Sequence, residues 1–190
     1  MRINTLDEHL TNQIAAGEVV ERPASVIKEL FENSIDAGAT QINIEVSRGG
    51  HELIRVVDDG SGIDAQDLWL AIRRHSTSKI SSAEDLFAIE TLGFRGEALS
   101  SIASVSRLKL ISRRANAESG FYIHTEGGHA TETITPAAHT DGTTIEIRDL
   151  FFNTPARRKF LRTPRTEFIQ IESIVRRLAM SHFQIAIQLI

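Results

Sequence analysis

Short segments in which polar and apolar residues alternate recur along the chain, and they restrict the fold more than any other feature. Residues 41–47 (QINIEVS) alternate with the period of a half-buried strand, and Gly49-Gly50 separates them from a second strand at 52–57. Further strands are predicted at residues 107–112, 120–125, 130–135 and 143–148. The segments that connect successive strands are short and polar, which favours antiparallel pairing.

Segments of helical periodicity precede and interrupt these strands. A helix is predicted from Pro23 to about Asp36, because proline is tolerated in a first turn and Gly38 can end the helix. Other helices are predicted at residues 6–16, 67–74, 96–103 and 164–180. The last of these should pack through Phe168, Ile171, Ile174, Val175 and Leu178. The order of elements predicts an α+β fold, a two-layer α/β sandwich.

The composition narrows the classes of function. The chain has 190 residues, enough for one ordinary domain, and no cysteine, which excludes disulfides and thiolate metal sites. No apolar run approaches the roughly 20 residues that span a bilayer, so no membrane partner is expected. The seven histidines are scattered without metal-ligand spacing.

Charge is distributed unevenly along the chain. Residues 1–150 carry 14 Lys/Arg against 23 Asp/Glu, whereas residues 151–190 carry 7 against 2. The basic residues of the second part could neutralise DNA phosphates without reading sequence. The candidates are Arg157, Arg158, Lys159, Arg162, Arg165 and Arg177, with Arg176 beside them. The alternative is a solvated helical face whose arginines cap the helix or pair with acids of the body.

One face of the helix predicted at 23–36 combines groups suited to phosphoryl transfer. At about 100° per residue, Glu29, Asn33 and Asp36 share a narrow arc, apart from an apolar arc that also contains Ser34. A carboxylate can deprotonate an attacking water, and an amide oxygen one turn away can bind Mg²⁺. The alternative is an exposed polar stripe on a surface helix.

Two glycine-rich segments have the character of ligand-binding loops. Asp58-Asp59-Gly60-Ser61-Gly62 follows a strand, where a carboxylate could accept a hydrogen bond from an exocyclic amine and glycine lets the backbone approach a flat ring. Residues 91–99 run from a glycine loop into a helix, an arrangement that suits anions. The preceding residues 77–79 could close over a phosphate chain. A plain tight turn and a helix-capping loop are the respective alternatives.

Six stretches together resemble the motif series of MutL-type mismatch-repair proteins. The resemblance extends over nearly the whole chain, and the stretches GFRGEAL at 93–99 and NTPARRKFL at 153–161 are specific to that group. The stretches are GEVVERPASVIKELFENSIDAGAT, DDGSGI, HSTSKI, LGFRGEALSSIASV, GTT and FFNTPARRKFL. The resemblance implies a Bergerat-type ATPase fold, with a mixed, mainly antiparallel sheet and helices on one face.

The same resemblance assigns roles at an ATP and Mg²⁺ site. It makes Glu29 the general base that activates water, Asn33 the Mg²⁺ ligand and Asp58 the reader of the adenine amino group. Gly62 would lie beside the ring and Thr143 would support that end. The phosphates would be held by Thr77, Ser78 and Lys79 and by the loop of Gly93, Phe94, Arg95, Gly96, Glu97, Ala98 and Leu99.

The resemblance also implies a domain organisation and a set of partners. Residues 1–20 would be an N-terminal dimerisation arm or, alternatively, a frayed terminus. Residues 21–183 would form the ATP-binding domain, with a lid at about 76–95. Residues 184–190 would be a strand at a truncated end that leads to a second domain. Such a fragment would hydrolyse ATP slowly or not at all. The implied partners are DNA, a mismatch-recognition protein of the MutS type, a downstream nuclease and helicase, and a second copy in an ATP-dependent homodimer, in the bacterial cytoplasm near the nucleoid.

Two other functions compete with the ATPase switch of mismatch repair. One is a non-hydrolysing module that binds nucleotide and DNA to assemble partners, for which the carboxylate of Glu29 would have no purpose. The other is the ATPase domain of a type II topoisomerase subunit. The sequence motifs GFRGEAL and NTPARRKFL argue against the topoisomerase, because they are the stretches specific to the MutL-type group.

Overall fold

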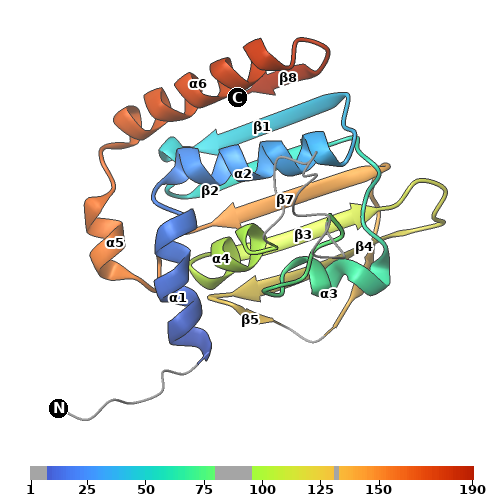
Figure 1. The fold of residues 1–190 in the computed structure, drawn as a ribbon, viewed down its shortest axis with the longest axis horizontal. Coiled ribbons are helices and arrows are strands. Elements are labelled where there is room, and N and C mark those ends of the chain that lie inside the picture. The colour runs from blue at the N-terminus through green and yellow to red at the C-terminus, as the bar shows by residue number, and fades with distance from the viewer. Residues whose placement is uncertain (1–7, 80–95, 131–132) are drawn as a thin grey trace.

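The computed structural model describes residues 8–79, 96–130 and 133–190. Its strands are β1 (Gln41–Ser47), β2 (Leu53–Asp58), β3 (Arg107–Arg113), β4 (Gly120–Glu126), β5 (His129–Ala130), β6 (Thr135–Ala137), β7 (Gly142–Arg148) and β8 (Ala186–Leu189). They form an eight-stranded sheet in the order β5-β4-β3-β7-β2-β1-β8, with β6 paired to β4 (Figure 1). β1 pairs with β8 in parallel and the other described pairs are antiparallel. The predicted mixed, mainly antiparallel sheet is confirmed.

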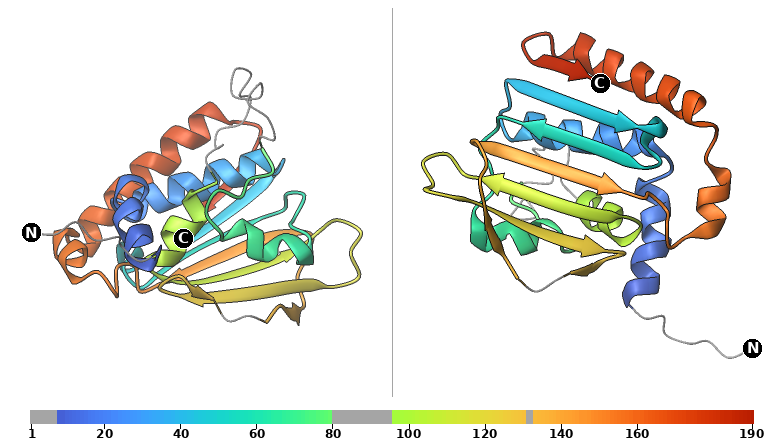
Figure 2. Two further views of the ribbon diagram at one scale, coloured as in Figure 1. Left: turned by 60° about the horizontal axis from the view of Figure 1, so that its bottom comes forward. Right: turned by 180° about the vertical axis from the view of Figure 1, so that it is seen from behind.

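The helices form a second layer on one face of this sheet. They are α1 (Glu8–Val19), α2 (Pro23–Asp36), α3 (Leu68–Ala71), α4 (Ala98–Ser104), α5 (Pro155–Phe160) and α6 (Pro164–Ser181), with 3-10 turns η1 (Arg48–Gly50) and η2 (Ala65–Asp67). Figure 2 shows α1, α2 and α4 over one face and α6 beside the edge made by β1 and β8. No described helix covers the opposite face, and none of the described helices is long and apolar enough to cross a membrane. The predicted two-layer α+β fold is confirmed.

The core lies between α2 and the inner face of the sheet. Alternate residues of the strands point inward and are buried, as the period of two predicts. On α2 the buried residues include Ile27, Leu30 and Phe31. Pro23 stands at the first helical position, and Gly38 follows the helix with a φ of 73°. The start and stop signals in the sequence therefore give the observed bounds of α2.

Several predicted elements differ from the structure in length. The helix predicted at 67–74 is only one turn, α3, which ends at Ala71; the chain leaves helical geometry at Ile72 and turns again at His75, where φ is 58°. The strand predicted at 130–135 is divided between β5 and β6, which pair with opposite ends of β4. α5 was not predicted, although Thr154 followed by Pro155 is a helix-start signal.

The C-terminal helix α6 packs through four of the five residues of its predicted stripe: Ile171 and Val175 are buried, and Ile174 and Leu178 pack against the core. The exception is Phe168, which is 37% exposed, whereas its neighbour Glu167 is fully buried. Its carboxylate accepts a hydrogen bond from the Arg162 amide at 2.9 Å and lies 3.7 Å from Nε of Arg22. The Arg162 amide thus satisfies Oε1, whereas Oε2 has no hydrogen bond among the described residues and only the longer contact with Arg22. β8 follows this helix and pairs as an edge strand with β1.

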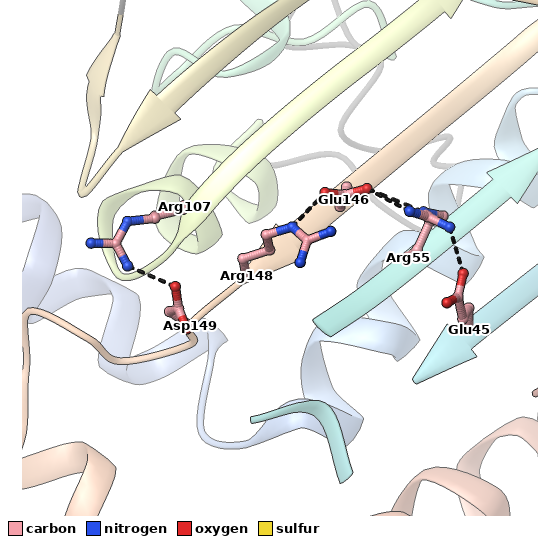
Figure 3. Close-up of polar contacts among 6 residues, drawn as sticks. All are labelled: Glu45, Arg55, Arg107, Glu146, Arg148 and Asp149. Atoms are coloured by element: carbon pink, nitrogen blue, oxygen red, sulfur yellow. Dashed lines mark hydrogen bonds and ion pairs between the residues drawn. The ribbon is translucent and has the colours of Figure 1, made fainter. Parts of the chain in front are cut away.

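A ladder of charged residues crosses the face of the sheet opposite the helices. Arg55 of β2 lies between Glu45 of β1 and Glu146 of β7, with Nη1 2.6 Å from Glu45 and Nη2 2.9 Å from Glu146 (Figure 3). Arg148 adds a contact of 2.6 Å to Glu146. Burial raises the pKa of Glu146, but hydrogen bonds from Arg55 and Arg148 outweigh it and the net shift is downward. Opposite charges on neighbouring strands thus favour the observed register.

We predict that Glu146→Gln lowers the free energy of unfolding by about 1 kcal/mol at neutral pH, since the ladder is partly exposed to solvent. The folded-state pKa lies below the unfolded one, so the contribution is present above the unfolded pKa and disappears as pH falls through the folded pKa. Urea unfolding of wild type and variant at pH 7 and pH 3 measures this. The difference should shrink at pH 3. Glu52→Gln, in an exposed pair with Arg48, serves as the control and should change little.

Candidate functional site

A cavity of about 760 Å³ opens between α2 and the ends of the neighbouring strands and loops. One wall is the polar face of α2, and another is the end of β2 with the turn that follows it. The predicted site residues among its lining are Glu29, Asn33, Asp58, Gly62, Thr77, Ser78, Lys79, Gly96, Glu97, Ala98, Leu99 and Thr143. Segments far apart in the sequence therefore meet at one cavity, which α1 completes with Glu18 and Val19.

The polar face of α2 lies as the helical wheel predicts. Glu29, Asn33 and Asp36 line the cavity while the opposite side of the helix is buried in the core. The side chain of Glu29 is 27% exposed, and Nζ of Lys28 lies 3.4 Å from its Oε1. Lys28 is held more closely by Glu32, at 2.8 Å. Glu29 is thus accessible to a water in the cavity, and a cation beside it partly offsets the negative charge of this wall.

Asp58, at the end of β2, also lines the cavity and is nearly buried. Its Oδ2 accepts a hydrogen bond of 2.8 Å from the hydroxyl of Ser34, and its Oδ1 one of 3.0 Å from the amide of Gly60. Burial raises the pKa of Asp58, and the hydrogen bonds from Ser34, Gly60 and the Thr143 backbone only partly oppose this. Each carboxylate oxygen has two lone pairs. The group is therefore fixed in place and can still accept a hydrogen bond from a ligand.

Two glycines permit the close backbone contacts around Asp58. Gly142 has a φ of 113°, and a Cβ there would overlap the carbonyl oxygen of Asp58. Gly62 has a φ of 69°, and a Cβ there would overlap the carbonyl oxygen of Arg113 at the end of β3. Gly62 lines the cavity as predicted, but the structure adds a second reason for glycine, the contact with the neighbouring strand.

Lys79 reaches across the cavity to the polar face of α2. Its Nζ lies 2.9 Å from Oδ1 of Asn33 and 2.6 Å from Oδ2 of Asp36. The backbone amide of Lys79 donates to Oγ1 of Thr77 at 3.1 Å, which shapes the turn before it. A lysine among these oxygens shows that this wall attracts cations. The predicted phosphate residues Gly93, Phe94 and Arg95 lie outside the described residues.

The cavity suits Mg²⁺ only in combination with a ligand that brings its own oxygens. No group of three or more acidic or histidine side chains among the described residues could hold a metal ion alone. Mg²⁺ commonly takes one or two protein oxygens and completes its shell with phosphate oxygens and water. Asn33 beside an open cavity fits that pattern.

The basic residues of the C-terminal part have different surroundings. Arg158, Lys159, Arg162, Arg165 and Arg177 are exposed. Arg176 is exposed but lies 2.9 Å from Glu172. Arg157 is half-buried, and its Nη2 donates to the carbonyl of Ile14 in α1 at 3.3 Å. Arg157 therefore faces the body of the protein rather than solvent.

Comparison with known proteins identifies the family. Residues 21–146 match the family described as histidine kinase-, DNA gyrase B- and HSP90-like ATPase. The chain belongs to this ATPase family. The matched part contains the predicted site residues on α2, β2 and β7, and those in the predicted phosphate-binding segments 77–79 and 93–99.

Within the ATPase family, the chain is similar to MutL. It is 59% identical over 188 residues to the DNA mismatch repair protein MutL of Pseudomonas putida (strain W619), which covers 99% of this chain and 30% of that protein. The MutL of Proteus mirabilis (strain HI4320) is also 59% identical, over 100% of this chain and 28% of its own length. The chain thus spans about 30% of the length of these relatives. The resemblance to MutL-type proteins is confirmed.

Solved structures agree with the family assignment. The Aquifex aeolicus MutL ATPase domain complexed with ADP superposes with a TM-score of 0.70 at 35% identity, covering 90% of this chain and 60% of that one. The crystal structure of the N-terminal domain of a DNA repair protein gives 0.78 at 30% identity, covering 94% and 51%. The domain therefore has the fold of a MutL ATPase domain.

Two features of this ATPase-family cavity were missed by sequence analysis. Ser34 was placed in the apolar arc of α2, yet its hydroxyl holds Asp58. A polar residue within an otherwise apolar arc was the available signal. Glu18 and Val19 were assigned only to the arm, and no local pattern indicates that α1 reaches the cavity.

We predict that Ser34→Ala raises the pKa of Asp58 further, because it removes a hydrogen bond that favours the ionised carboxylate. It should also lower the free energy of unfolding by about 1–2 kcal/mol, since a buried acceptor loses its donor. Carboxyl NMR titration and urea unfolding measure the two effects. Ser106→Ala is the control, because this buried hydroxyl donates to the carbonyl of Ile102 instead. An unchanged Asp58 pKa in Ser34→Ala would contradict the assignment.

Proposed function

We propose that the cavity binds ATP with Mg²⁺ and hydrolyses it slowly, and that the domain is the ATP-driven dimerisation switch of a MutL-type mismatch-repair protein. One observation carries this proposal: a fixed, nearly buried carboxylate and an accessible carboxylate–amide pair line the same cavity. The first suits a base with an exocyclic amine, and the second suits a hydrolysable phosphate chain. The similarity to a MutL domain complexed with ADP supports the choice of nucleotide.

The adenine end of the proposed complex lies at Asp58. Its carboxylate accepts the hydrogen bond of the adenine amino group, with Gly62 beside the ring and Thr143 next to Asp58 across β2 and β7. The burial that raises the pKa of Asp58 also makes adenine recognition sensitive to pH. Binding weakens as pH falls through this pKa, because the protonated carboxyl is a poorer acceptor.

The phosphate end lies at α2. When bound, Mg²⁺ neutralises charge on the phosphate oxygens, and Asn33 is its protein ligand. Glu29 accepts a proton from the attacking water and orients it toward the terminal phosphorus. Lys79, with Thr77 and Ser78, holds phosphate oxygens at the described end of the predicted lid. Its ammonium lies beside Asn33, the proposed Mg²⁺ ligand, and Asp36.

The dimerisation part of the proposal rests on α1. This helix packs on α4 and contributes Glu18 and Val19 to the cavity, so a nucleotide there contacts the predicted arm directly. Binding of ATP can thus change the position of residues 8–19 and favour association with a second copy. The remaining proposed partners are a mismatch-recognition protein of the MutS type and a downstream nuclease and helicase, in the bacterial cytoplasm.

We predict that Glu29→Ala in the intact protein lowers the rate of ATP hydrolysis by about 100-fold or more, because it removes the base. The variant should still bind nucleotide, seen as a rise in melting temperature with Mg²⁺ and a non-hydrolysable ATP analogue. Asp58→Ala is the matched contrast, and it should lose that rise. Surviving hydrolysis in Glu29→Ala would leave a nucleotide-binding assembly module as the better account.

We also propose that DNA binds along the exposed basic residues Arg158, Lys159, Arg162, Arg165 and Arg177. Charge reversal at Arg162 and Arg177 together should weaken duplex binding for all sequences and reduce the slope of log K against log salt by about 2. Fluorescence anisotropy over a salt series measures this. Arg114→Glu, an exposed arginine in the part of the chain after β3, is the control. Equal binding of wild type and the reversed variant at low salt would exclude this surface.

A further inference from the structure

Gly17 lies in α1 near the C-terminal end of this helix, although glycine disfavours helical structure. Gly17 is the third residue from the C-terminal end of the helix, which runs from Glu8 to Val19. Glycine is the least favourable helical residue after proline, so a structural reason is expected for it. The reason is a neighbour on its open side: a Cβ at Gly17 would overlap Nη2 of Arg157. Gly17 and Arg157 therefore fit each other across α1 and α5.

The guanidinium of Arg157 makes a specific contact with the same turn of α1. Nη2 donates to the carbonyl of Ile14, one turn before Gly17, at 3.3 Å. Nη1 is buried and has no hydrogen-bond partner among the described residues. A charged group held in this way is not available to a DNA phosphate unless it first leaves α1. Arg157 thus differs from its exposed neighbours Arg158 and Lys159.

Another side of α1 is fixed by the core. Ala16 of α1 and Val20, the residue that follows the helix, are buried, and the helix packs on α4. Glu18 and Val19, between these anchors, line the nucleotide cavity. The last turn of α1 is therefore held both by the core and by Arg157, and that turn is a wall of the cavity.

We propose that Arg157 is a positioning residue that clamps the last turns of α1 and so holds the α1 wall of the nucleotide cavity in place. Its partner in the clamp is Gly17, whose missing side chain makes room for the guanidinium. The clamp itself is independent of the bound ligand, whereas its effect on nucleotide affinity rests on the function proposed above. It removes Arg157 from the set of DNA-binding residues.

Hydrogen exchange of the intact protein without nucleotide tests the clamp. Arg157→Ala should make the amides of residues 13–19 exchange roughly 10-fold faster, as expected for loss of a charged hydrogen bond. Gly17→Ala should do the same, because the new methyl group displaces the guanidinium at the end of its flexible side chain. The double variant should be no faster than either single one, since both remove the same contact. Exchange in β3 and β7 should not change in any variant.

Gly17→Ala separates the clamp from ordinary helix stability. Helix propensity alone predicts that alanine slows exchange in α1, whereas the clamp predicts that it accelerates exchange. Slower exchange in Gly17→Ala, or unchanged exchange in Arg157→Ala, would overturn the proposal. Arg176→Ala removes the same charge from an exposed position on α6 and is the control, which should show wild-type exchange in residues 13–19.

Calorimetric titration with a non-hydrolysable ATP analogue and Mg²⁺ tests the consequence for the cavity. Arg157→Ala and Gly17→Ala should weaken binding by a similar factor, while Arg176→Ala should not. Wild-type affinity in both variants would refute the link from clamp to cavity. If wild type itself bound no nucleotide, the proposed function would fail, and the exchange data would still decide whether the clamp exists.

Discussion

Burial of one side of α2 against the sheet is the interaction on which the site depends. The orientation of this helix about its own axis is fixed by Ile27, Leu30 and Phe31, which are buried. Turning the helix would expose these side chains to water, at a free-energy cost of about 1.5–3 kcal/mol for each. With that side held in the core, Glu29 and Asn33 must face the cavity. The same packing brings Ser34 to the end of β2, where its hydroxyl holds Asp58. Fold and chemistry are thus set by the two sides of one helix.

Local patterns predicted much of this arrangement. The bounds of α2 and β1 follow from Pro23, Gly38 and the alternation at 41–47, because these signals act on neighbouring residues only. The helical wheel also separated the polar arc of α2 from the packing arc. The sequence motifs predicted the family, and the comparison with MutL proteins confirmed this prediction. That Asp58 and Asn33 line one cavity needed the family resemblance, since pairing across a sheet is not a local property.

The features that escaped prediction depend on what lies opposite a residue. A helical wheel assigns Ser34 to one side of α2. It does not show that the side chain next to Ser34 is the carboxylate of Asp58, 24 positions away in the sequence. No sequence pattern singles out Glu167 on α6, yet it is fully buried, with the Arg162 amide and the side chain of Arg22 beside its carboxylate. Arg157 belonged to a basic run by sequence, and only tertiary packing places its guanidinium on α1, 143 positions away. In each case a distant partner changes the role that charge or polarity suggests.

A crystal structure of the protein with Mg²⁺ and a non-hydrolysable ATP analogue tests nucleotide binding in this cavity most directly. We expect the adenine amino group within hydrogen-bonding distance of Asp58, the metal bound to Oδ1 of Asn33, and Nζ of Lys79 moved from Asn33 to a phosphate oxygen. A nucleotide bound outside this cavity, or one inside it with the adenine away from Asp58, would show that the proposed site is wrong.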